Sequence, residues 1–250
     1  MTCRSYAGAA VVALSVATAA AVAPGPTVGA APSDARPTGS APEVRQLVVF
    51  RSGASVQRRV RARSAAVRVS GRRCALAAGT PLAALVRARP GRIVLRDFGS
   101  CTRRARDSGQ LFVRSIRGDR NRGQDGWIYK VGRRLPDAGS GDPAGPFGRG
   151  RLRSGQRVTW FFGRKQGASF QRTLELKATV SGRNVTVLVR GYDDNGRGVT
   201  VPGAAVSSGA GSAQTNANGH ATLQLPPGRH LFHASKPGFV RSFGERVVVR

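Results

Sequence analysis

The feature that most constrains the fold of this chain is a pair of aromatic-bearing segments joined by a long loop rich in glycine and proline. The first segment, 126–131, carries Trp127 and Tyr129, and the second, 156–162, carries Trp160 and follows a glycine turn. Apolar and aromatic residues at alternate positions are typical of β-strands, whose side chains two residues apart share one face. The sequence therefore predicts two neighbouring strands, each with an aromatic face.

Further strand-like segments surround this pair, and one helix interrupts them. Thr80 precedes Pro81 as a capping residue before a proline at the first helical position. Leu82, Leu85 and Val86 then form one apolar stripe, and the Pro90-Gly91 pair ends the pattern, so we expect a helix from Pro81 to about Ala88. One helix among several strands makes a small α+β domain. The expected strands lie at 47–50, 65–69, 92–97, 110–116, 126–131, 156–162 and 170–178.

The composition changes after residues 181–183, where charges become fewer and turn signals recur at short intervals. Asp194-Asn195-Gly196 and Asn218-Gly219 tolerate positive φ and are typical of hairpin turns. Short strands at 184–190, 220–225, 229–234 and 245–249 predict a β-sandwich. We therefore expect a mainly β protein with one short helix, in which an α+β domain at 47–180 is followed by a sandwich at 183–250.

Three motifs of the first region match a known family pattern. They are Gly79-Thr80-Pro81-Leu82-Ala83-Ala84-Leu85, the segment from Gly126 to Gly132, and the segment from Leu152 to Trp160. Together they resemble the transcobalamin-like C-terminal domain family over residues 47–178. The resemblance implies a β-grasp-like fold in a small secreted module that is linked with ligand binding and not with catalysis. The chain departs from the family pattern at Gly132-Arg133-Arg134, at Gln156 and in the long loop 139–150, so no particular ligand is implied.

The last region carries a second set of motifs. Val199 to Val206, Thr215 to Leu223, Pro227-Gly228 and Lys236-Pro237-Gly238-Phe239 are similar to carboxypeptidase regulatory-like and collagen-adhesin B-type modules over residues 183–250. This resemblance implies an Ig-like or prealbumin-like sandwich that acts as a stalk, spacer or adhesion unit. Some such modules carry a Lys–Asn isopeptide bond, which we do not expect here because the first strand lacks lysine and the last lacks asparagine.

The first thirty residues have the layout of an export signal. Arg4 gives a positive start, an uncharged run rich in alanine and valine follows at 7–23, and Val28-Gly29-Ala30 offers small residues for cleavage. An uncleaved membrane anchor is the alternative. Cleavage near Ala30 would leave a flexible leader at 31–46 and a secreted protein, extracellular or associated with the cell envelope. Cys74 and Cys101 are then an even pair, which indicates a disulfide, with two free thiols as the alternative.

The chain is strongly basic, with 41 Lys and Arg against 12 Asp and Glu and a formal charge of +29. Such a surface attracts polyanions, so we expect contact with an anionic cell-envelope polymer, or peripheral contact with a membrane or wall. No motif for specific nucleic-acid binding occurs. Codon bias in a GC-rich genome is the alternative explanation of the arginines, although it does not explain the shortage of acids. The candidate anion-binding residues are Arg58, Arg59, Arg61, Arg63, Arg72 and Arg73.

The residue types that catalysis or metal binding needs are sparse. His230 and His233 are three apart on an expected strand and so face opposite sides, and no serine lies in a G-x-S-x-G motif. The segment 193–196 resembles the start of a calcium loop, but its twelfth position is Ala204, which favours a hairpin turn. We therefore predict a protein that is not an enzyme and that has no metal site or cofactor.

The aromatic residues are the remaining candidates for function. The candidate ligand contacts are Trp127, Tyr129, Trp160 and Phe147, the last in the loop 139–150. One interpretation is that these residues only fill a core, and the other is an aromatic platform under a loop lid, for a flat or sugar-like ligand. We predict a non-catalytic binding or surface-association protein, whose first domain binds a small ligand or an anionic polymer and whose second domain is a spacer. The alternatives are a purely structural wall component held by charge, and a scaffold subunit of a secreted enzyme complex.

Overall fold

The computed structural model describes residues 40–99, 101 and 109–250. The predicted signal segment 1–30 and most of the predicted leader lie outside these residues. Strand β1 (Glu43–Val49) begins inside the segment that the sequence assigned to the leader, so that assignment was wrong for its last residues. Val44 and Val48 are buried in the core, and this burial explains why the strand starts early.

A four-stranded sheet is the centre of the N-terminal lobe, which we define as residues 43–163. Its order is β2-β1-β9-β8, where β2 is Ser55–Arg61, β8 is Gly126–Val131 and β9 is Arg157–Gly163. The predicted aromatic strands β8 and β9 are antiparallel neighbours, with Tyr129 opposite Trp160. Strands β1 and β9 pair in parallel, although more than a hundred residues separate them in the sequence.

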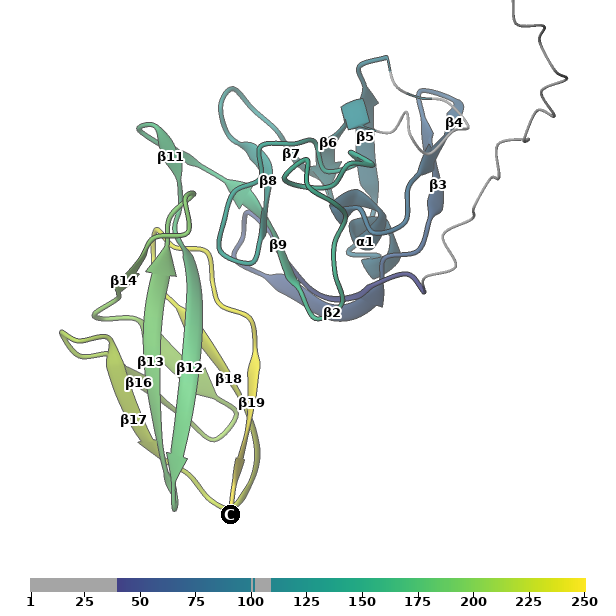
Figure 1. Cartoon of the computed structure of the whole chain (residues 1–250). Helices are drawn as coiled ribbons and strands as arrows, with labels where there is room; N and C mark the ends of the chain where they lie inside the picture. Colours follow the sequence, from purple (N-terminus) through teal and green to yellow (C-terminus); the bar gives the residue numbers. More distant parts are fainter. Residues whose placement is uncertain (1–39, 100, 102–108) are drawn as a thin grey trace, which may run out of the picture. The chain divides into compact units, whose positions relative to one another are not determined.

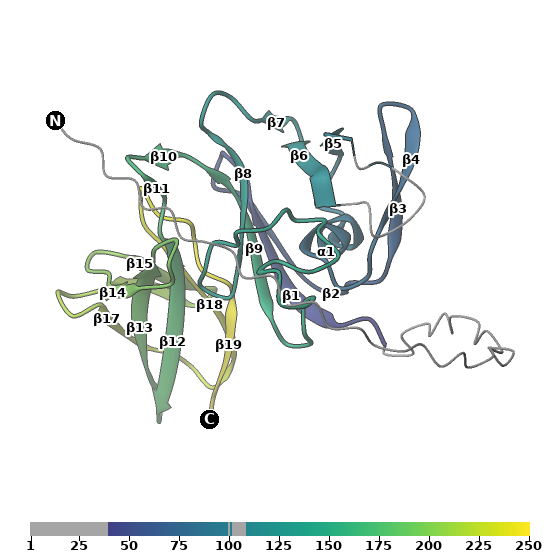
Figure 2. The ribbon, with the colours of Figure 1, turned by 45° about the horizontal axis from the view of Figure 1, so that its top comes forward.

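The predicted helix α1 (Pro81–Ala88) is confirmed together with its start signal. The side chain of Thr80 accepts a hydrogen bond from the backbone N–H of Ala83 at 3.2 Å, as an N-cap does. Leu82 and Leu85 are fully buried among the side chains of the core. Figures 1 and 2 show α1 with the four-stranded sheet on one side and the hairpin of β3 (Ala65–Val69) and β4 (Arg72–Leu76) on the other. No helix among the described residues is long and apolar enough to cross a membrane.

A second, smaller sheet completes this lobe. It contains β5 (Ile93–Asp97), β6 (Leu111–Ile116) and β7 (Asp119–Arg120) in that order. The predicted disulfide is confirmed, because Cys74 on β4 is bonded to Cys101. The bond therefore joins the β3–β4 hairpin to the segment that follows β5.

The C-terminal lobe, residues 173–250, is the predicted β-sandwich. One sheet has β13 (Asn184–Tyr192) at its centre, paired with β12 (Thr173–Ser181) along one edge and with β14 (Gly198–Thr200) and β17 (His220–Gln224) along the other. The other sheet has the order β16-β15-β18-β19, with β15 at Ala205–Ser208, β16 at Gly211–Gln214, β18 at Gly228–Ser235 and β19 at Glu245–Val249. Alternate residues of both sheets are buried in one core, including Val187, Val206 and Phe232. The chain as a whole is mainly β, with the fold class that the sequence predicts.

Two details of the predicted layout differ in the structure. Residues 181–183 are not a junction between domains but the tight turn of the β12–β13 hairpin, in which Ser181 is paired with Asn184. The division between the lobes falls earlier, at the small hairpin of β10 (Lys165–Gln166) and β11 (Ser169–Phe170). The turn at Asn218-Gly219 leads into β17, which pairs with β13 and not with the preceding strand, so it is a turn between sheets instead of a hairpin.

The two lobes contact each other through the outer face of the first sheet. A small apolar cluster joins Leu47, Val49 and Phe161 of the N-terminal lobe to Val240 and Phe243 of the C-terminal lobe. Ion pairs flank this cluster, and the Ser40–Arg250 segment forms one compact unit. The lobes are therefore packed against each other and not merely linked in sequence.

Candidate ligand-binding site

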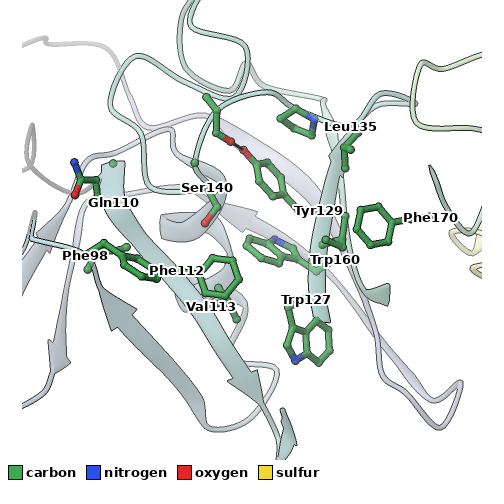
Figure 3. Close-up of a pocket in the computed structure, with 16 residues that line it drawn as sticks. Phe98, Gln110, Phe112, Val113, Trp127, Tyr129, Leu135, Ser140, Trp160 and Phe170 are labelled. Atoms are coloured by element: carbon green, nitrogen blue, oxygen red, sulfur yellow. Dashed lines mark hydrogen bonds between the residues drawn. The ribbon is translucent and has the colours of Figure 1, made fainter. Parts of the chain in front are cut away.

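A cavity of about 420 Å³ lies in the N-terminal lobe where β6 and β8 diverge. These strands belong to different sheets, in which β8 is an edge strand and β6 is paired with β7 only at Ser115 and Ile116, so that the rest of β6 has no strand partner on that side. Figure 3 shows sixteen residues around the cavity, with Phe112 on the β6 side and Trp127 and Tyr129 on the β8 side. The cavity thus lies between the edges of two sheets instead of inside either one.

Asn121 bridges the two strands beside this cavity. Its side-chain amide donates to the carbonyl of Val113 on β6 at 2.9 Å and accepts from the backbone N–H of Trp127 on β8 at 2.9 Å. One side chain therefore makes two hydrogen bonds that link β6 to β8, which are not paired as neighbours in a sheet. Gly126 is needed beside it, since a Cβ there would lie 2.7 Å from Cγ of Asn121. The cavity lies beside this bridge, since Val113 and Trp127 both line it.

Three of the four aromatic residues selected from the sequence meet at the cavity wall. Tyr129 and Trp160 stack with ring centroids 5.1 Å apart, and Trp127 packs edge-on against Phe162 at 6.0 Å. All three residues are buried in the hydrophobic core and also line the cavity. The two interpretations of these residues are thus compatible in this geometry, because the same rings fill the core with one side and border the cavity with the other.

Two exposed phenylalanines border the cavity on the opposite side. Phe98 is 56% exposed and Phe112 is 47% exposed, and their rings meet edge-on with centroids 6.2 Å apart. Sequence reasoning missed both residues. The alternation in β6 could have indicated Phe112. Leu111 and Val113 are buried there, and Phe112 occupies the outward position that normally carries a polar residue. An aromatic ring on the solvent side of an alternating strand indicates a contact surface.

The segment Leu135–Ser140 forms the rim of the cavity. The hydroxyl of Tyr129 donates to the carbonyl of Ala138 at 2.7 Å, which fixes this rim against β8. Burial raises the pKa of Tyr129, and the charges of Asp142 and Asp137 raise it further, so the hydroxyl stays protonated and remains a donor. Gly139 passes so close to Gly109 that a Cβ would lie 2.4 Å from the carbonyl oxygen of Gly109. The rim is therefore held closely at both of its sides.

Phe147 does not belong to this cavity, which corrects the prediction of a lid over the aromatic platform. Its ring is partly buried against the core, and the guanidinium of Arg134 lies 5.4 Å from the ring centroid. The part of the long loop that borders the cavity is its start, at Gly139 and Ser140. A lone aromatic residue in a glycine-rich loop gave no indication of this packing partner, because Arg134 is distant in the sequence.

The arginines selected from the sequence lie in three places. Arg58 and Arg59 are exposed on the edge strand β2 and line a separate polar cavity between the lobes. Arg61 and Arg63 are at and just beyond the end of β2, and Arg72 and Arg73 are at the start of β4. The structure therefore brings only the first two together at a cavity.

The geometry of the aromatic cavity indicates which chemistry it suits. None of the sixteen described residues that line it is charged, although the chain has a formal charge of +29. In the described part of the chain, no group of three His, Cys, Asp or Glu side chains is arranged to hold a metal ion. No family model, curated protein or solved structure matches this chain. The uncharged, aromatic lining of the site suits an uncharged, flat, largely apolar molecule.

Proposed function

We propose that this protein is a non-catalytic binding protein that takes an uncharged aromatic or otherwise flat apolar ligand into the cavity between β6 and β8. The observation that carries the proposal is the lining of that cavity. Six of its residues are aromatic, namely Phe98, Phe112, Trp127, Tyr129, Trp160 and Phe170. Aromatic rings offer a large contact area at a small loss of conformational entropy, which favours binding of flat molecules.

The sequence supports the same proposal from two directions. The resemblance to the transcobalamin-like C-terminal domain family, a group linked with ligand binding, rests on the strands that carry Trp127, Tyr129 and Trp160. The signal-like first thirty residues and the disulfide between Cys74 and Cys101 favour a protein that works outside the cytoplasm. We therefore propose a secreted binding protein, whose C-terminal sandwich supports the ligand-binding lobe.

A neutral fluorescent probe tests this proposal. N-phenyl-1-naphthylamine is flat, uncharged and emits strongly in apolar surroundings. The protein has two tryptophans, Trp127 and Trp160, and both line the cavity. Bound probe should therefore accept excitation energy from them. We expect saturable binding to the wild-type protein, with tryptophan emission quenched in step with the rise of probe emission.

The double variant Phe98→Ser/Phe112→Ser locates the binding site. Loss of two ring contacts, each about 0.5–1.5 kcal/mol, should weaken probe binding by about tenfold or more. A matched control exists, because Val248 and Val199 are 56% and 47% exposed, the same values as Phe98 and Phe112. The variant Val248→Ser/Val199→Ser should bind the probe as the wild type does. Unsaturable binding, or equal losses in the two double variants, would rule the proposal out.

A further inference from the structure

A second cavity, of about 720 Å³, lies between β2 and the strands β18 and β19. Gln57 on β2 holds its two sides together. Its side-chain oxygen accepts from the backbone N–H of Gly244 at 2.6 Å, and its nitrogen donates to the carbonyl of the same residue at 3.3 Å. Gly244 is required at this place, since a Cβ would lie 2.7 Å from Cε1 of His233. The cavity is thus a built feature of the contact between the lobes.

The charges around this cavity are strongly unbalanced. One carboxylate lines it, that of Glu245, and this group is already engaged by Arg157 at 2.6 Å and by Arg45 at 3.4 Å. The five arginines that line the cavity are Arg45, Arg58, Arg59, Arg241 and Arg246. Among the described residues, Arg45 forms an ion pair and the other four do not.

The arrangement of these cations is unfavourable without a counter-charge. Arg59 lies directly opposite Arg45 in the β1–β2 ladder, a position at which like charges destabilise a sheet. Nε of Arg241 and Nδ1 of His233 line the same region and are buried without a hydrogen-bond partner in the described structure. Burial lowers the pKa of His233, and the charge of Arg241 lowers it further. An anion would relieve each of these costs.

We propose that this arginine-lined cavity is a binding site for a phosphate- or sulfate-type oxyanion. Guanidinium groups present planar pairs of N–H donors that match the oxygens of such groups. The site is distinct from the aromatic cavity and does not depend on the function proposed for it. Its volume accommodates more than one oxyanion group, so a short polyphosphate is a suitable probe.

Calorimetric titration with inorganic tripolyphosphate at about 0.15 M salt tests this site, because unspecific charge effects are screened over about 8 Å under those conditions. We expect saturable binding with one tripolyphosphate per chain. The variant Arg58→Gln/Arg246→Gln, which changes two exposed arginines of the cavity, should weaken binding by about tenfold or more, as the loss of charge-assisted hydrogen bonds predicts.

A matched control separates a site from general attraction. Arg72→Gln/Arg73→Gln removes the same amount of charge from the exposed start of β4, outside the cavity. This control should lose less than about twofold in affinity, because salt screens the attraction between the probe and charges that lie outside the cavity. Equal losses in both double variants, or absence of saturable binding by the wild type, would overturn the proposal. Intrinsic tryptophan emission checks that each variant is folded, and a rise of the wild-type melting temperature with tripolyphosphate gives a second measure that needs no variant.

The source of the oxyanion is distinguished by comparing tripolyphosphate with long-chain polyphosphate at equal phosphate concentration. Similar affinity per bound site assigns the cavity to a small or terminal phosphate group. A strong preference for the long chain assigns it to groups along a polymer. Either result supports the oxyanion site only when Arg58→Gln/Arg246→Gln weakens binding of the phosphate compound and Arg72→Gln/Arg73→Gln does not.

Discussion

Lys130 shows how one side chain joins the lobes. Its side chain is fully buried, and its ammonium lies 3.1 Å from the carboxylate of Asp194 and donates to the carbonyl of Tyr192 at 3.2 Å. Burial lowers the pKa of Lys130, while the charge of Asp194 opposes that effect. This buried ion pair joins β8 to the turn that follows β13.

The variant Lys130→Met should be strongly destabilised. It keeps the apolar stem but leaves Asp194 with no ion-pair partner in a poorly hydrated place, and removal of one member of a buried pair costs about 3–5 kcal/mol. Urea unfolding measures this loss. The double variant Lys130→Met/Asp194→Asn should recover part of the stability, because no charge is then left alone. A single variant that unfolds at the wild-type urea concentration would show that the pair has no role in stability.

At the scale of elements, acid sensitivity should appear where β12 is held to the N-terminal lobe. Glu175 on β12 accepts two hydrogen bonds from Arg133, at 2.7 and 2.9 Å, and these lower its pKa below the ordinary value of 4.5. A carboxyl whose pKa is lower in the folded state contributes stability above its unfolded pKa, and this contribution is lost as the pH falls through the folded value.

Melting temperatures between pH 7 and pH 3 test this effect. The wild type should lose stability below about pH 4.5 more steeply than Glu175→Gln, which has no proton to gain. At pH 7 the wild type should be the more stable of the two. Parallel pH profiles would mean that the Arg133 contact persists in the unfolded state or contributes nothing.

The elements themselves were predictable where local signals agreed. Thr80, Pro81 and the apolar stripe predict α1 with its bounds, and alternation predicts β6, β8 and β9. Strands β2 and β4 were missed because both lie in an arginine-rich segment that suggests a solvated surface. β2 is an edge strand with mostly exposed side chains, so its sequence carries little of the alternation that marks a half-buried strand.

At the scale of the whole molecule, the sequence did not show which surfaces meet. The parallel pairing of Arg45 with Arg157 and the contact of the first sheet with β19 connect segments that are far apart in the chain. The same limit applies to the sites. Strand alternation identified Trp127, Tyr129 and Trp160, but the two cavities arise from edges and faces that only the tertiary structure brings together. Composition predicted an anionic partner, but it did not show that β2 supplies only part of the lining of the arginine-lined cavity.

The contact between the lobes should make the described structure unfold as one unit. Phe243 of the C-terminal lobe is buried against Leu47, Val49 and Phe161, and the guanidinium groups of Arg45 and Arg157 lie within 5.4 and 5.6 Å of its ring centroid. Since both tryptophans are in the N-terminal lobe, tryptophan emission follows that lobe alone, whereas far-ultraviolet circular dichroism follows both. Coincident transitions of the two signals in urea indicate a single cooperative unit.

Replacement of Phe243 by alanine should uncouple these signals. The loss of a buried aromatic ring costs about 3–5 kcal/mol, and here the cost falls on the contact between the lobes instead of either lobe's own core. The emission and circular dichroism midpoints, which we expect to coincide in the wild type, should then separate. If the wild-type midpoints already differ, the lobes are independent despite their contact. If those of Phe243→Ala still coincide, the flanking ion pairs at Lys130 and Arg157 are sufficient for coupling, and the apolar cluster is not its main source.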